Sequence, residues 1–118
     1  MEIPRPRDED RALFAEVMPD SAEVLVKPMF GNLGAFVNGN MFAGLFGSTI
    51  GVRVLADATR AEFADTPGTR SFGPSERPMK DYVGLPADWD ADRLRDAVET
   101  AFAEVRALPP KAPKAKKP

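Results

Sequence analysis

The chain has 118 residues, 43% of them hydrophobic and 29% charged, which is typical of one globular domain rather than a disordered chain. It contains no cysteine and no histidine, which excludes disulfides and catalytic pairs of serine or cysteine with histidine and argues strongly against a zinc site. We therefore expect a non-catalytic protein without cofactors. No apolar run reaches the ~20 residues of a membrane helix, and the charged start lacks a secretory signal, so we expect a cytoplasmic location.

The net charge of −2 is unevenly distributed along the chain. Residues 109–118 contain four lysines and no acid, so residues 1–108 carry 12 basic and 18 acidic side chains. We predict a folded domain over residues 1–108 and a disordered tail over residues 109–118, which is rich in lysine and proline. The tail either solubilises the protein or makes weak, salt-dependent contacts with nucleic acid. The lysines that would make these contacts are Lys111, Lys114, Lys116 and Lys117.

The first half of the chain predicts one helix followed by strands. A helix is expected over residues 8–18, where apolar side chains recur at helical spacing between Asp8, a suitable capping residue, and Pro19. Residues 24–55 are rich in valine, phenylalanine and isoleucine and are interrupted by glycines. This pattern predicts three antiparallel strands.

The pair Asn38-Gly39 is the strongest hairpin signal, because both residues accept the positive φ angles of a type I′ turn. This turn predicts that Phe36 pairs with Met41 and that Ala35 pairs with Phe42. One face of the sheet would then carry Phe36, Met41, Ala43 and Leu45, and the other would carry Leu33, Ala35, Val37, Phe42 and Phe46.

Both predicted faces are apolar, whereas a sheet with one face in water usually alternates apolar and polar residues. We therefore expect the helices to cover one face. The rest of the chain or a second subunit would cover the other, so a homodimer through the sheet is one hypothesis.

The second half predicts a short helix from Asp57, one or two strands near Phe72 and over residues 79–85, and a last helix that ends near Leu108. Asp88 or Asp90 would cap the last helix. Its apolar stripe contains Leu94, Ala97, Val98, Ala101, Phe102, Val105 and Leu108. The predicted fold is therefore an α+β domain, in which helices pack on an antiparallel meander sheet.

Four segments are distinctive in combination, namely MFGNLGAFVNGNMFAGLFG at 29–47, the strand at 50–54, ATRAEF at 58–63 and RPMKDYVGLP at 77–86. Together they resemble the TfoX N-terminal domain family, in the stand-alone form without the second domain of the bacterial competence regulators. The resemblance covers about Val24 to Leu108 and implies the order α-β(3)-α-β(2)-α. It also implies a regulatory or adaptor role through binding a protein, with no known catalytic residues.

Arg53, Arg77 and Lys80 are the basic residues inside the most family-like segments. If the strands bring them together, they form a site for an anion or an acidic partner. The alternative is that they are solvated or paired with acids such as Asp81. A weak nucleic-acid binder that uses the tail, and a small-ligand binder, are the other functions that we consider.

Two further patterns have ordinary structural explanations. The segment Gly31–Gly34 has the composition of a phosphate loop, but a strand follows it instead of a helix, which favours a tight bend or bulge. The acids from Asp88 to Glu99 imitate the spacing of a calcium loop, but Arg93 stands where that loop needs glycine. We interpret these acids as the N-terminus of the last helix.

Overall fold

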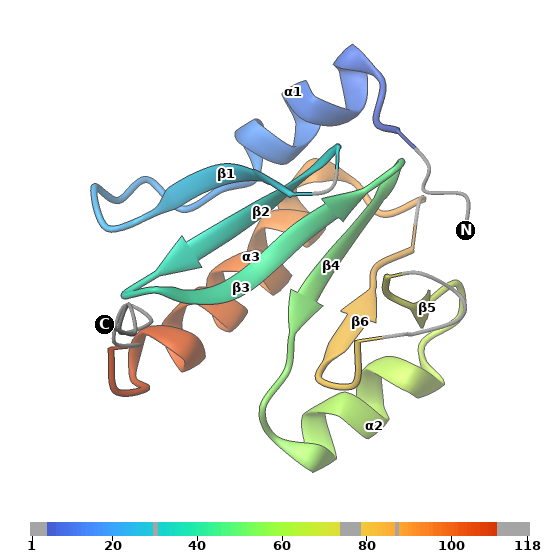
Figure 1. Ribbon diagram of the computed structural model, residues 1–118. Helices are drawn as coiled ribbons and strands as arrows, with labels where there is room; N and C mark the ends of the chain where they lie inside the picture. The colour runs from blue at the N-terminus through green and yellow to red at the C-terminus, as the bar shows by residue number, and fades with distance from the viewer. Residues whose placement is uncertain (1–4, 30, 74–78, 87, 111–118) are drawn as a thin grey trace, which may run out of the picture.

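The computed structural model describes residues 5–29, 31–73, 79–86 and 88–110 (Figure 1). The three helices are α1 (Asp8–Glu16), α2 (Asp57–Asp65) and α3 (Ala91–Arg106). The strands are β1 (Leu25–Met29), β2 (Asn32–Val37), β3 (Asn40–Phe46), β4 (Thr49–Arg53), β5 (Arg70–Ser71) and β6 (Tyr82–Gly84).

The six strands form one antiparallel sheet in the order β1-β2-β3-β4-β6-β5, which confirms the predicted α+β fold. Strands β1 to β4 are a meander of four strands where three were predicted. The additional strand is β1, at one edge of the sheet. Its first four residues are exposed on both faces, and it contains Pro28. This strand was missed because it lacks the alternation of a half-buried strand, and proline is tolerated at a sheet edge.

The hairpin between β2 and β3 forms at the predicted turn, where Asn38 and Gly39 have φ angles of 51° and 80°. Phe36 pairs with Met41 as predicted. Ala35, however, pairs with Ala43 and not with Phe42, because the register shifts between Ala35 and Phe36. The shift leaves Phe42 as an extra residue in β3, which is a β-bulge.

The bulge corrects the predicted faces of the sheet. Ala43 and Leu45 pair with Ala35 and Leu33, so they lie on the face of the helices and not beside Met41. Phe46 lies on the opposite face, where its ring is 6.2 Å from that of Phe72. The prediction assumed that side chains alternate between the two faces all along β3, starting from the hairpin. Because the bulge adds one residue, that assumption gave the wrong face for every residue after it.

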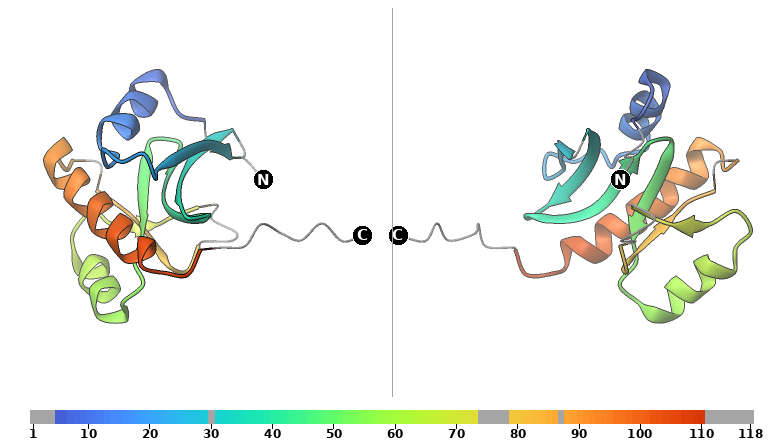
Figure 2. Two further views of the ribbon diagram at one scale, coloured as in Figure 1. Left: turned by 90° about the vertical axis from the view of Figure 1, so that its left-hand side faces the viewer. Right: turned by 45° about the vertical axis from the view of Figure 1, so that its right-hand side comes forward.

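The three helices contribute to one hydrophobic core on one side of the sheet (Figure 2). Phe14 and Val17 enter this core from α1 and its C-terminus. Phe42 packs edge to face against Phe102 of α3, with ring centroids 5.2 Å apart. On α2, Phe63 lies 6.4 Å from Trp89, the residue that precedes the cap of α3. The helices therefore cover this face over β2, β3 and β4, while β1 at the edge stays exposed.

A row of glycines crosses the other face of the sheet. Gly34, Gly44, Gly51 and Gly84 are paired neighbours on β2, β3, β4 and β6. The ring of Phe72, which follows β5, lies against the backbone of Gly44 and Gly51. Phe72 is only 3% exposed although it lies outside the main core. The chain itself therefore covers the middle of this face with a single aromatic ring.

The last helix follows its prediction closely. Asp90 caps it, since the Asp90 carboxylate accepts a hydrogen bond of 2.9 Å from the backbone N–H of Arg93. Five residues of the predicted stripe are buried in the core: Leu94, Ala97, Val98, Ala101 and Val105. The acids near residue 90 therefore serve the N-terminus of α3, as predicted.

We predict that Val98→Asp unfolds the domain, because Val98 is 0% exposed at the centre of the core. An unpaired carboxylate at this position would cost more than about 4 kcal/mol, which is a large part of the stability of a small domain. Ala103→Asp is the matched control, because Ala103 is exposed on the same helix. Thermal melting followed by circular dichroism should show a cooperative transition for the control only. A native transition in Val98→Asp would contradict the packing of α3.

Candidate functional site on the open sheet face

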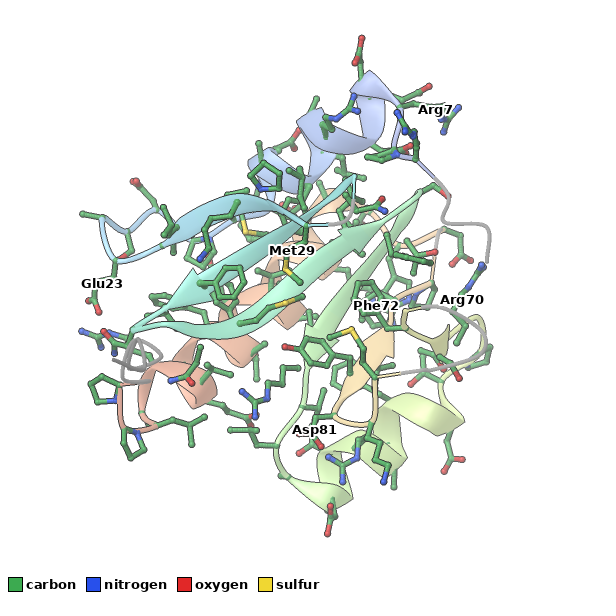
Figure 3. The ribbon with its side chains drawn as sticks, viewed as in Figure 1. Arg7, Glu23, Met29, Arg70, Phe72 and Asp81 are labelled. Atoms are coloured by element: carbon green, nitrogen blue, oxygen red, sulfur yellow. The ribbon has the colours of Figure 1, made fainter. Side chains whose placement is uncertain are left out.

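The face of the sheet opposite the helices is the candidate site, and we call it the open sheet face. Figure 3 shows Met29 and Phe72 lying over the sheet on this side. Met29, Phe36, Met41 and Phe46 are only half-buried here. The Lys27 ammonium lies 4.5 Å from the centroid of the Phe36 ring, within range of a cation–π contact. The surface therefore combines accessible aromatic rings and methionines with positive charge.

A central depression of about 620 Å³ lies beside the β2–β3 hairpin on this face. Its lining includes Phe36, Met41, Arg53, Lys80, Asp81 and Tyr82. The Tyr82 hydroxyl donates a hydrogen bond of 3.1 Å to the backbone carbonyl of Met41. Tyr82 thereby connects β6 with β3 across the depression. Such a depression with an aromatic and sulfur-containing wall is suited to an apolar side chain of a partner.

The structure brings together two of the three predicted basic residues. Arg53 and Lys80 both line the central depression, whereas Arg77 lies outside the described residues. The Arg53 guanidinium is 3.7 Å from the Asp81 carboxylate, the pairing that the sequence offered as the alternative. Arg60 of α2 also lies 3.7 Å from Asp81. Asp81 therefore holds two arginines at the boundary between β4 and α2.

A second hollow of about 310 Å³, which we call the basic depression, adjoins the first. Lys80 and Tyr82 line both depressions. The other lining residues that carry polar side chains are Arg60, Thr69, Arg70 and Ser71. Within the described part of the chain, no acidic side chain lines the basic depression. This end of the sheet is therefore suited to a negatively charged group.

The sequence did not predict Arg60 and Arg70 as site residues. Arg60 lies on a helix that reads as an ordinary amphipathic element, and Arg70 lies in an irregular segment with a strand of only two residues. Both lie close to Lys80 and Tyr82 only because β6 lies between β4 and β5 in the sheet. A pairing between strands that are not consecutive in sequence has no local signal, so the sequence alone could not find it.

The tail begins beside the central depression. The Asn40 side-chain amide donates a hydrogen bond of 3.1 Å to the backbone carbonyl of Pro109. Gly39 and Asn40 also line the depression. Lys111, Lys114, Lys116 and Lys117 lie outside the described residues, so their contact with nucleic acid stays a prediction.

The remaining sequence patterns do not add a second site. Gly31 has a φ of 81° in the turn between β1 and β2, which agrees with the predicted tight bend. The Asn32 side chain accepts a hydrogen bond of 2.7 Å from the backbone N–H of Gly47. In the ranges that the structure describes, no three acidic side chains gather as metal ligands. No described helix has the length and apolar character to cross a membrane.

Comparison with known proteins agrees with the resemblance in the sequence. Residues 13–105 match the family model of the TfoX N-terminal domain. The match includes the hairpin, the glycine row and both depressions. No curated protein and no solved structure shows significant similarity to the chain.

Burial raises the pKa of Tyr82 to about 12 from its ordinary value of 10.0. Between these two pH values the unfolded chain releases the proton while the folded chain retains it. We therefore predict that stability falls as pH rises from 10 to 12, by about 2 kcal/mol in total. Tyr82 is the only tyrosine, so its ionisation can be followed directly by absorbance near 295 nm.

Tyr82→Phe is the control, because lysines also titrate in this range and contribute to the same slope. Denaturant unfolding at several pH values should show a smaller loss of stability in Tyr82→Phe than in the wild type. A Tyr82 that titrates near pH 10 would show that the ring is solvated and that the contact with the Met41 carbonyl is not maintained.

Proposed function

Because the chain belongs to the TfoX N-terminal domain family, we propose that it is a non-catalytic regulatory or adaptor domain that binds another protein on its open sheet face. This family is not a known enzyme family. The absence of histidine and cysteine removes the commonest general base and the strongest nucleophile of protein side chains. Binding is therefore the function that the chemistry of the chain favours.

The single observation that carries the proposal is that the open sheet face lacks a helical cover among the described residues. Met29, Phe36, Met41 and Phe46 remain half-buried in this surface, while Ala35, Val37, Ala43 and Leu45 on the other face are buried in the core. Aromatic and methionine side chains are enriched in protein interfaces, where they fill pockets of a partner. A partner would complete the burial that Phe72 and Tyr82 provide among the described residues.

Charge favours a different protein over a second copy of this chain. The strands carry Lys27, Arg53 and Arg70 and no acidic residue, whereas acids outnumber basic residues in each helix. A two-fold contact between open sheet faces would bring these basic groups together with those of the second copy, which is unfavourable. A homodimer through the sheet therefore remains a hypothesis that electrostatics does not support.

A nucleic-acid contact through the tail is the second candidate function. One observation favours it: the hydrogen bond from the Asn40 side chain to the Pro109 carbonyl holds the start of the tail at the β2–β3 hairpin, beside the central depression. The four lysines of residues 109–118 would give a weak electrostatic contact with phosphates. Removal of residues 111–118 would abolish such binding and would leave binding of a protein at the open sheet face intact.

We predict that Phe36→Asp removes the protein partner without unfolding the domain. The carboxylate would lie in the apolar wall of the central depression and would prevent an apolar side chain from entering it. Val26→Asp is the matched control, because Val26 is 41% exposed on the neighbouring strand and points to the opposite face. Both variants should be checked by thermal melting before use.

The measurement is affinity capture from the native host, followed by mass spectrometry of the retained proteins. A protein that the wild type and Val26→Asp retain equally, and that Phe36→Asp loses, would support the proposal. Equal retention by all three proteins, or equal loss in both variants, would contradict a specific role of the open sheet face.

A further inference from the structure

We infer that the basic depression binds a carboxylate-bearing segment of the protein partner, next to an apolar side chain held in the central depression. The inference rests on the proposed function and adds the chemical class of the partner. It also adds a site, formed by Arg60, Arg70, Lys80 and Ser71.

The basic residues of this depression differ in how far they are already paired. Arg60 is fixed by the Asp57 carboxylate, by Asp81 and by the Val54 carbonyl, to which it donates a hydrogen bond of 2.7 Å. Arg70 and Lys80 form no ion pair with any described residue. Among the described residues, two positive charges therefore have no acidic partner, beside a third that is held by two carboxylates. A carboxylate can accept charge-assisted hydrogen bonds from such groups.

The glycine row positions Arg70. Gly84 pairs with Arg70 across β5 and β6, and a Cβ atom on Gly84 would lie 2.8 Å from the Arg70 Cγ. The missing side chain lets the stem of Arg70 lie flat on β6, on the same face as Tyr82. Arg70 thereby lines the basic depression from the β5 edge of the sheet, where Figure 3 labels it.

The two depressions are neighbours, because Lys80 and Tyr82 line both. A partner segment that places an apolar side chain against Phe36 and Met41 would bring its neighbouring residues to Lys80 and Arg70. The surface therefore matches a segment in which apolar residues lie next to acidic residues. Charge complementarity of this kind contributes both to specificity and to the association rate.

An acidic peptide fits the surface better than nucleic acid does. Asp81 lines the neighbouring central depression, and both Asp81 and Asp57 are paired with Arg60. A nucleic acid carries a phosphate at every nucleotide and would have to pass these carboxylates and the acidic helices. A short acidic segment needs only the local positive charge of Arg70 and Lys80.

The inference can be tested with a fluorescein-labelled peptide of two leucines followed by four glutamates, and with a matched peptide that has four glutamines. Fluorescence anisotropy should show that the full chain binds the glutamate peptide at least about tenfold more tightly. Arg70→Glu should weaken binding by about tenfold, since it replaces a donor by a repelling charge. Arg11→Glu, with the same charge change on α1, should leave the affinity unchanged.

Four outcomes would overturn the inference: no binding of the glutamate peptide at millimolar concentration, equal binding of both peptides, equal affinity of Arg70→Glu and the wild type, or equal weakening in both variants. Inorganic phosphate or a single-stranded oligonucleotide that displaces the peptide at lower concentration would reassign the basic depression to phosphate groups. Thermal melting of each variant separates loss of binding from loss of folding.

The experiments distinguish failure of the proposed partner surface from failure of the proposed acidic class of partner. If Phe36→Asp loses a protein partner while the acidic peptide does not bind, the open sheet face remains the partner surface and only the acidic class is rejected. If the peptide binds but Phe36→Asp retains every partner, the basic depression stands as an anion site outside the partner surface.

Discussion

The bulge at Phe42 is the constraint on which the arrangement of both sheet faces depends. It adds one residue to β3 between Met41 and Ala43, so that Phe42, Ala43 and Leu45 all enter the core beneath α3. Without it, alternation along β3 would put Ala43 and Leu45 on the side of Met41. The same bulge places Gly44 and Phe46 on the open sheet face, where Gly44 joins the glycine row and Phe46 meets Phe72.

The glycine row determines what the open sheet face can become. Four glycines on adjacent strands leave a shallow floor of backbone, and Phe72 fills its middle. Met29 and Met41 fill the part near β2 and β3, while the Arg70 stem fills the end at Gly84. The surface is therefore shallow, partly apolar and positively charged at one end, and its methionine side chains can adjust to a partner.

The sequence predicted most elements because their signals are local. The stripe of α3, its cap at Asp90 and the turn at Asn38-Gly39 depend on residues within a few positions of each other. The bulge had no such signal, because it shows only in the pairing of Ala35 with Ala43. The strand β1 was missed because its exposed residues and Pro28 hide the expected alternation.

The candidate site was predicted only in part for a related reason. Arg53 and Lys80 stood out because they lie in distinctive segments, and the structure does place both at one depression. Arg60 and Arg70 join them only because β6 lies between β4 and β5, which is a property of the complete sheet. The sequence did indicate a second apolar face, because the strands carry apolar residues on both sides and the helices were expected to cover only one side.

The most direct test of the central claim is photo-crosslinking in living cells from two neighbouring residues that point to opposite faces. Leu25, which is 55% exposed, pairs with Phe36 on the open sheet face, whereas Val26 points to the other side. With p-benzoylphenylalanine at either position, we predict a crosslink to a different protein from position 25 and none from position 26. No product from position 25, equal products from both positions, or a product of twice the chain mass would contradict the claim that this face binds a protein other than a second copy.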